Sequence, residues 1–285
     1  MCTMTEEFLR KVFTSLKDMV SALSAFGDVR SVVVFGSAAR LKDFVKDVSD
    51  IDVLVITRKR PRIPHYGFEV HGAEVSITIM SLDDVRKIFE SGHPLAFMLY
   101  KYTKVLVDDG TFSTLISTIK PKVTERTLRI LRHSTFVALG LGLEKYFAQL
   151  YREAISHAYH AVRHMVRYKA CLKGVDANNF PISDDEVKSF LPEYAKGVFE
   201  KLVELRRRKI GKEDCMNALE DSRKLISSEM GCCIPSFRDL EQRILEENGH
   251  IVSVMLEEKT CSVEVSCIVR VDSCYRTLVL KCNNK

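Results

Sequence analysis

The sequence predicts an α+β protein in three parts: an N-terminal α/β part with a small mixed sheet, an α-helical bundle, and a C-terminal antiparallel α+β unit. Two apolar runs near the N-terminus have the length and composition of buried strands. Between residues 120 and 230 there is little strand signal, and after residue 250 the apolar residues alternate with period two. A chain of 285 residues is long enough for two or more domains. The predicted domains are 1–118, 119–232 and 233–285.

The first predicted elements are a helix and two strands. Residues 5–26 place apolar side chains three or four positions apart, which is typical of an amphipathic helix. The runs 29–37 and 50–57 are rich in valine and isoleucine, which favours buried strands. Residues 67–80 then read as two strands around a glycine turn.

Two helices and a last strand complete the N-terminal part. Residues 81–92 predict a short helix with Ser81 as its N-cap and acidic residues in its first turn. Residues 94–109 predict a further helix followed by a short strand. We therefore expect helices and strands to be mixed throughout this part of the chain.

The remaining segments predict helices and then a small sheet. Residues 124–174 are helical in pattern over most of their length, with Gly174 as a stop signal. Segments 181–209 and 211–231 predict two more helices, so the middle of the chain reads as a bundle. A helix at 235–249 precedes three alternating segments, which predict an antiparallel meander.

Composition places the chain among ordinary globular proteins. Apolar residues make up 46% and charged residues 28%, which argues against disorder. No apolar run approaches the roughly 20 residues that cross a bilayer, and the charged N-terminus lacks the apolar core of a signal peptide. We therefore expect a cytoplasmic protein with no membrane partner. The net charge of +5 permits a polyanionic substrate without requiring one.

The nine cysteines argue against a disulfide framework. Their number is odd, and a chain of this length does not depend on covalent staples. No Cys-x-x-Cys occurs, and the spacings near the C-terminus do not match the usual zinc ligands. We expect these cysteines to act as small buried hydrophobic residues. The four near the C-terminus are Cys261, Cys267, Cys274 and Cys282.

Two aspartates stand out in the second apolar run. Asp50 and Asp52 project from one side of a strand, whereas Ile51 and Val53 project from the other. Like charges this close repel each other unless a cation lies between them. Mg²⁺ binds carboxylates together with phosphate oxygens and water. We therefore expect a metal site at Asp50 and Asp52; the alternative is a turn cap beside an exposed edge-strand charge.

A glycine and a serine end the preceding strand. Gly36 would let the backbone approach a ligand closely, and Ser37 would offer a hydroxyl and an amide to a phosphate. An apolar strand, Gly-Ser, about a dozen residues and then Asp-x-Asp form a coherent pattern. This spacing predicts a combined metal and phosphate site and favours it over the turn-cap alternative.

The pattern resembles the signature of the DNA polymerase β-like nucleotidyltransferase superfamily. It is most similar to the small archaeal and bacterial members known as minimal nucleotidyltransferases. The signature is a hydrophobic residue with Gly-Ser, then an arginine, then Ser-Asp-hydrophobic-Asp. The matching residues are Phe35, Gly36, Ser37, Arg40, Ser49, Asp50, Ile51 and Asp52.

The resemblance implies transfer of a nucleoside monophosphate, such as AMP from ATP or the equivalent from another nucleoside triphosphate, with pyrophosphate leaving. It implies that Asp50 and Asp52 are catalytic and hold Mg²⁺ or Mn²⁺. Two metals about 4 Å apart would clamp the attacking and leaving oxygens. The implied nucleotide-binding residues are Gly36, Ser37, Arg40 and Ser49.

The third carboxylate of the family normally comes from the next strand. In this sequence the alignment places Ser76 in the acidic position. Glu74 lies on the same face one pleat earlier, and we expect it to be catalytic if a bulge brings it into place. If Ser76 occupies the position, the site has two acids, and catalysis is weakened or replaced by nucleotide binding alone.

The helical part is similar to HEPN domains, which accompany many nucleotidyltransferases. Residues 151–174 resemble their first long helix, and 204–226 resemble their later helices; the helical half of kanamycin-type nucleotidyltransferases is the alternative. Arg152, His157 and Tyr159 match the Arg-x-x-x-x-His-x-Tyr motif of ribonuclease HEPN toxins. Five residues on a helix place Arg152 and His157 about 140° apart, which favours packing or a cleft-lining role.

We therefore expect a metal-dependent nucleotidyltransferase. Its partners would be a nucleoside triphosphate and an acceptor that is a small molecule, a protein or RNA, with homodimerisation through the helical bundle as an option. The alternative is a catalytically weakened nucleotide-binding or toxin–antitoxin-type interaction protein of the same class. A HEPN ribonuclease regulated in cis is a third interpretation.

Overall fold

The computed structural model describes residues 2–24, 28–46, 48–259 and 262–282. The chain forms two compact units. The first contains the residues up to Leu128 together with Cys171–Asp184, and the second contains Arg129–Ala170 and the residues from Asp185 onward. The α+β class is confirmed, because helices, a mixed sheet and an antiparallel sheet are all present. The three predicted domain boundaries stay a prediction.

The first unit is built on a five-stranded sheet with the strand order β3-β4-β2-β1-β5. The pairing of β2 with β4 is parallel, and the other pairs are antiparallel. The two predicted apolar runs form β1 and β2, and the two strands predicted around the glycine turn are β3 and β4. The strands are β1 (Val29–Phe35), β2 (Ile51–Thr57), β3 (His65–Val70), β4 (Ala73–Ser81) and β5 (Lys104–Asp108).

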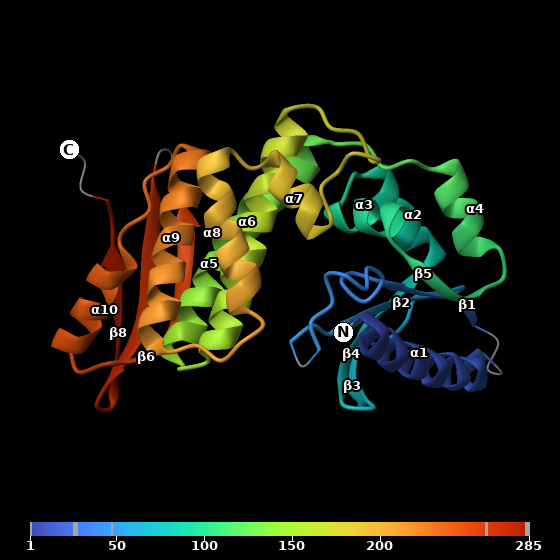
Figure 1. Ribbon diagram of the computed structural model, residues 1–285, viewed down its shortest axis with the longest axis horizontal. Coiled ribbons are helices and arrows are strands. Elements are labelled where there is room, and N and C mark those ends of the chain that lie inside the picture. Colours follow the sequence, from blue (N-terminus) through green and yellow to red (C-terminus); the bar gives the residue numbers. More distant parts are fainter. Residues whose placement is uncertain (1, 25–27, 47, 260–261, 283–285) are drawn as a thin grey trace. The chain divides into compact units, whose positions relative to one another are not determined.

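Helices cover both faces of this sheet (Figure 1). Helix α1 (Cys2–Ser24) packs on one face, where Val53 and Val55 of β2 are buried. The opposite face carries Leu54 and Ile56, which are buried as well. The helices on that face are α2 (Leu82–Glu90), α3 (Pro94–Lys101) and α4 (Thr111–Thr118). Both faces of β2 are therefore covered by helices. The one acidic residue of this strand, Asp52, is its second residue.

The predicted N-cap of α2 is confirmed. The hydroxyl of Ser81 accepts a hydrogen bond from the backbone N–H of Asp84 at 3.2 Å. Asp83 and Asp84 stand in the first turn, where negative charge is favoured by the helix dipole.

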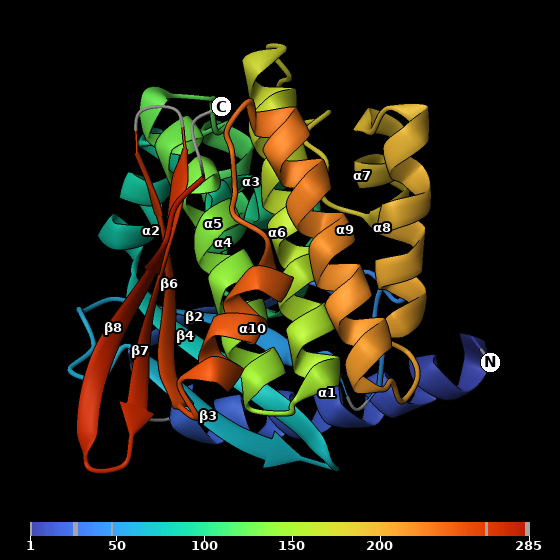
Figure 2. The same ribbon diagram turned by 90° about the vertical axis from the view of Figure 1, so that its left-hand side faces the viewer.

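The second unit combines helices with a three-stranded antiparallel sheet of order β6-β7-β8 (Figure 2). The predicted meander is present, and so are the predicted helices, except that segment 181–209, predicted as one helix, forms the two helices α7 and α8. The helices are α5 (Glu125–Phe147), α6 (Tyr151–Leu172), α7 (Asp184–Phe190), α8 (Glu193–Leu205), α9 (Lys212–Met230) and α10 (Phe237–Glu246), of which α5, α6 and α7 extend across the limits of the unit. The strands are β6 (His250–Glu258), β7 (Val263–Val271) and β8 (Cys274–Leu280).

The sheet of the second unit shares one hydrophobic core with the helices. A Cβ placed on Gly140 of α5 would lie 3.3 Å from the side chain of Leu256, so the helix and β6 approach closely there. The Glu144 carboxylate accepts a hydrogen bond from the backbone N–H of Val254 at 3.1 Å. This contact satisfies a backbone donor at the edge of the sheet.

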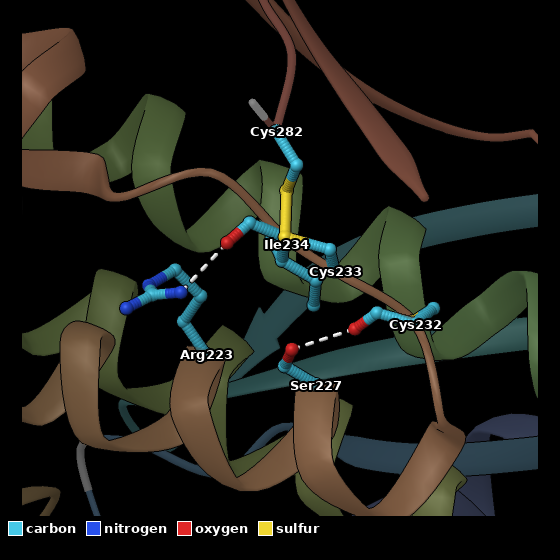
Figure 3. Close-up of a disulfide and its surroundings, with 6 residues drawn as sticks. All are labelled: Arg223, Ser227, Cys232, Cys233, Ile234 and Cys282. Atoms are coloured by element: carbon cyan, nitrogen blue, oxygen red, sulfur yellow. Dashed lines mark hydrogen bonds between the residues drawn. A yellow bond between two sulfur atoms is a disulfide. The ribbon is translucent and has the colours of Figure 1, made fainter. Parts of the chain in front are cut away.

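A disulfide joins Cys233 to Cys282, 49 residues later (Figure 3). It ties the chain after β8 to the segment between α9 and α10. That segment is also held from α9: Arg223 Nη1 donates to the carbonyl of Ile234 at 2.6 Å, and Ser227 Oγ donates to the carbonyl of Cys232 at 2.6 Å.

The expectation for the C-terminal cysteines is therefore only partly right. Cys267 is buried and free, as expected. Cys282 is disulfide-bonded and Cys274 is exposed, and both differ from the expectation. Cys261 lies outside the described residues. Within the described part of the chain, no helix combines the length and apolar character needed to span a bilayer.

Candidate functional site

The Gly36–Ser37 turn directly follows β1 and touches Asp52. Gly36 has a φ of +71°, a backbone conformation that L side chains rarely adopt. A Cβ on Gly36 would overlap the Oδ2 atom of Asp52 and lie 3.3 Å from its Cγ. Glycine is therefore required here for its backbone conformation and for the space that the Asp52 carboxylate occupies.

Replacing Gly36 should have a larger effect than replacing a glycine in open space. We expect Gly36→Ala to lower the free energy of unfolding of the first unit by roughly 2–3 kcal/mol, since backbone strain and overpacking add. Gly174 has a φ of +78°, and a Cβ added there would meet no atom within 4 Å. Gly174→Ala should therefore cost only about 1 kcal/mol. Urea unfolding of both variants tests this, and equal losses would contradict it.

Asp52 is the most perturbed carboxyl group of the site. It lies in β2 and pairs with Phe35 on one side and Ser76 on the other. Burial raises the pKa of Asp52 to about 7, and the nearby Asp50 carboxylate contributes to this increase. The Arg40 guanidinium acts in the opposite direction and lowers the pKa of Asp52. A buried acid beside a second acid is a group that a cation would stabilise in its charged form.

Asp50 precedes β2 and is exposed. It lines a pocket of about 260 Å³ together with two other acidic residues, Glu69 and Glu74. Phe8 and Phe44 provide apolar walls. Asp50 is thus open to ligands from solution, whereas Asp52 is half-buried.

The register of β2 and β4 settles which residue stands beside which acid. Asp52 pairs with Ser76, and the parallel pairing continues without a shift from Ile51 to Thr57. No bulge brings Glu74 next to Asp52. Glu74 is exposed and instead shares the pocket that Asp50 lines. The position beside Asp52 is therefore occupied by a hydroxyl group.

Arg40 holds the Gly36–Ser37 turn. Its Nε donates to Asp43 Oδ2 at 2.8 Å, and its Nη1 donates to the Gly36 carbonyl at 2.8 Å. Its backbone N–H donates to the Ser37 carbonyl at 2.9 Å. Two of its guanidinium nitrogens are thus engaged inside the protein, and the Nη2 group makes no hydrogen bond to the residues that the structure describes.

The two serines of the signature have different surroundings. The Ser49 hydroxyl accepts a hydrogen bond from the backbone N–H of Val45 at 3.1 Å, and the Ser49 N–H donates to the Val45 carbonyl at 2.8 Å. Ser49 therefore closes the turn that leads into β2. The Ser37 side chain is half-buried and has no hydrogen-bond partner among the described residues, which leaves its hydroxyl for a ligand.

The donor set fits a hard divalent cation that is completed by a substrate. Among the described residues there is no group of three or more His, Cys, Asp or Glu side chains arranged to hold a metal. Asp50 and Asp52 supply two carboxylates. Mg²⁺ is commonly held by one or two carboxylates together with waters and the phosphates of its substrate. Burial is the main cause of the raised pKa of Asp52 and the Asp50 carboxylate adds to it, so a cation bound beside the two groups would favour the charged form of Asp52.

Arg152 and Tyr159, two of the three residues of the ribonuclease-like motif of α6, make packing contacts. Arg152 Nε donates to the backbone carbonyl of Arg206 at 3.0 Å. The Tyr159 side chain is 2% exposed, and its ring stacks on Phe199 with 5.6 Å between centroids. These contacts agree with the packing role that the helical spacing favours.

Asp43 is a residue that sequence reasoning missed. Its carboxylate is 5% exposed and bonded to Arg40, three residues earlier. The Arg–x–x–Asp spacing is a signal for a local ion pair. It was not sufficient by itself, because such spacings are common on solvated surfaces.

A known protein family matches the segment of the chain that contains these residues. Residues 9–139 match the family model of the nucleotidyltransferase domain, and this segment contains the Gly36–Ser37 turn and both aspartates. This match supports a nucleotidyltransferase domain in the N-terminal part of the chain, with nucleotidyl transfer as its general reaction. The HEPN-like character of the helical part stays a prediction.

A nucleotidyltransferase-like protein of known structure from Exiguobacterium sibiricum is similar to the chain. The two are 15% identical over 82% of this chain and 80% of that one, with a TM-score of 0.35. No curated protein matches the chain.

Proposed function

We propose that the first unit transfers AMP from ATP to an acceptor in a reaction that depends on Mg²⁺. The observation that carries this proposal is the contact between Gly36 and Asp52. A turn suited to binding phosphate and a carboxylate that favours a cation meet there in close contact. The nucleotidyltransferase domain match over the same residues supports the class of reaction.

Each residue of the site has a role in this proposal. Asp50 and Asp52 would hold the metal, which when bound neutralises phosphate charge and lowers the barrier to displacement. The Ser37 hydroxyl and the turn amides would donate to the triphosphate. Arg40 would hold the turn in shape and add positive charge to the site. Catalysis of this kind rests mainly on positioning and charge neutralisation.

Transfer of label is the test of the proposed reaction. Purified protein would be incubated with Mg²⁺ and ATP labelled at the α-phosphate, alone and with cell-derived protein, RNA and small-molecule fractions. We expect a labelled product with wild type and roughly a thousandfold less product with Asp52→Asn, because asparagine lacks the negative charge that Asp52 would supply to the metal. Equal labelling by wild type and Asp52→Asn would contradict the proposal.

A second candidate function is nucleotide binding without turnover. The observation that favours it is the pairing of Ser76 with Asp52, because a neutral hydroxyl brings no negative charge to a metal and is a much weaker proton acceptor than a carboxylate. Under this candidate the protein binds Mg²⁺–ATP and acts as a sensor or as a toxin–antitoxin-type interaction protein.

Restoring an acid separates the two candidates. If the site has lost its catalytic group, Ser76→Asp should create transfer activity that wild type lacks. If Glu74 supplies the acid from its neighbouring position, Glu74→Gln should abolish the activity of wild type. Thr78→Asp, two residues further along the same face of β4, is the matched control and should do neither.

A further inference from the structure

Asp43 is a buried acid outside the nucleotidyltransferase signature. Its side chain is 5% exposed, and its Oδ2 atom accepts the hydrogen bond of Arg40 Nε at 2.8 Å. The backbone N–H of Asp43 donates to the Arg40 carbonyl at 2.8 Å. A side-chain bond and a backbone bond therefore fix Asp43 against the same arginine.

A chain of contacts leads from Asp43 to the nucleotide site. Arg40 Nη1 donates to the Gly36 carbonyl at 2.8 Å, and Gly36 lies against the carboxylate of Asp52. A guanidinium group is planar and rigid, so fixing its Nε also fixes the direction of its Nη1. The carboxylate of Asp43 thus decides where Arg40 holds the Gly36 carbonyl.

We propose that Asp43 is a positioning residue for nucleotide binding. It orients Arg40, which holds the Gly36 carbonyl and thereby shapes the Gly36–Ser37 turn that receives the triphosphate. This inference rests on the proposed function, because it assigns a task to the same site.

Asp43 could instead compete with ATP for Arg40, and the two roles predict opposite changes in ATP affinity when the Asp43 charge is removed. If Arg40 served only to bind the triphosphate, Asp43 would compete with that ligand for the guanidinium group. Removal of the Asp43 charge would then free Arg40 and tighten ATP binding. If Asp43 positions the turn, its removal must weaken binding.

The experiment measures the affinity of the full chain for Mg²⁺–ATP by isothermal titration calorimetry. We expect Asp43→Asn to weaken binding about tenfold, the effect of one charge-assisted hydrogen bond. Arg40→Lys should weaken it by a similar factor, because lysine keeps the charge but cannot reach both Asp43 and Gly36. The double variant should lose little more than either single one. Unchanged or tighter binding by Asp43→Asn would overturn the proposal.

A matched pair elsewhere controls for general loss of stability. Arg223 and Glu220 in α9 form the same Nε–carboxylate contact at 2.8 Å with three-residue spacing, and their side chains are 14% and 7% exposed. Glu220→Gln should leave the affinity for Mg²⁺–ATP unchanged. An equal loss in Glu220→Gln and Asp43→Asn would mean that the effect is not positional and would overturn the proposal.

A measurement made without nucleotide tests the positioning role of Asp43 independently of whether the protein binds Mg²⁺–ATP. Amide hydrogen exchange of residues 36–39 should be faster in Asp43→Asn than in wild type, while exchange in β1 stays the same. If wild type does not bind Mg²⁺–ATP, the proposed function fails. Unchanged exchange at residues 36–39 would overturn the positioning role in either case. Should Asp43→Asn fail to fold, Arg40→Lys carries the same comparison.

Discussion

Loss of the Cys233–Cys282 disulfide is expected to lower the free energy of unfolding of the second unit by about 4 kcal/mol. The bond links residues 49 positions apart, and a crosslink over a loop of that length restricts the unfolded chain by about this amount. Strand β8 pairs only with β7 and is mostly exposed, so few other contacts hold this part of the described chain. The double variant Cys233→Ser/Cys282→Ser removes the bond without leaving a reactive thiol.

Hydrogen exchange in β7 at increasing urea concentration measures this loss, because its slowest amides report unfolding of the unit. Cys274→Ser is the matched control: Cys274 is exposed and free, and its replacement should change the stability by less than about 0.5 kcal/mol. A loss below about 1 kcal/mol in the double variant would show that the disulfide is not a main constraint.

The metal-free first unit is expected to become less stable as the pH rises from about 4 to about 7. Unfolded Asp52 ionises near its ordinary pKa of 3.8, whereas in the folded protein burial raises the pKa to about 7. Between these values the folded state keeps a proton that the unfolded state releases. Stability therefore falls with rising pH, by up to about 4 kcal/mol in total.

Asp52→Asn should remove this dependence, because asparagine stays neutral at all these pH values. Urea unfolding in the presence of a chelator, at pH values on both sides of the interval, provides the measurement.

Asp108→Asn is a control, because the contribution of Asp108 to stability changes with pH in the opposite direction. Hydrogen bonds from Ser113 and Ser31 lower the pKa of Asp108 against the effect of burial, so its contribution is lost as the pH falls. Identical pH profiles for wild type and Asp52→Asn would contradict the account.

The elements of the first unit could be predicted because their signals are local. Apolar runs marked β1 and β2, whereas the strand period used to place Asp50 and Asp52 on one face applies to Asp52 alone, because β2 begins at Ile51. The register of β4 against β2, in contrast, is not determined by any local sequence signal. A shift of the β2–β4 pairing by two residues would exchange Ser76 for Glu74 beside Asp52, and both arrangements keep the same face of β4 buried. Only the packed sheet distinguishes them.

The disulfide and the role of Arg40 were beyond sequence reasoning for a related reason. The pairing of Cys233 with Cys282 depends on where β8 ends relative to the segment before α10, and cysteine spacing does not encode that. The signature identified Arg40, but its partners are set by two consecutive turns that place Asp43 and the Gly36 carbonyl around the guanidinium group. A side chain with such partners can be recognised as structural only in the folded chain.

We propose that the Gly36–Ser37 turn and the two aspartates, Asp50 and Asp52, form one site for metal and nucleotide. Titration of the wild-type chain with ATP, with and without Mg²⁺, followed by calorimetry, tests it most directly. We expect saturable binding that requires Mg²⁺ and that weakens at least about tenfold in both Asp50→Asn and Asp52→Asn. Absence of binding by wild type, or binding that is the same in these variants as in wild type, would contradict the claim.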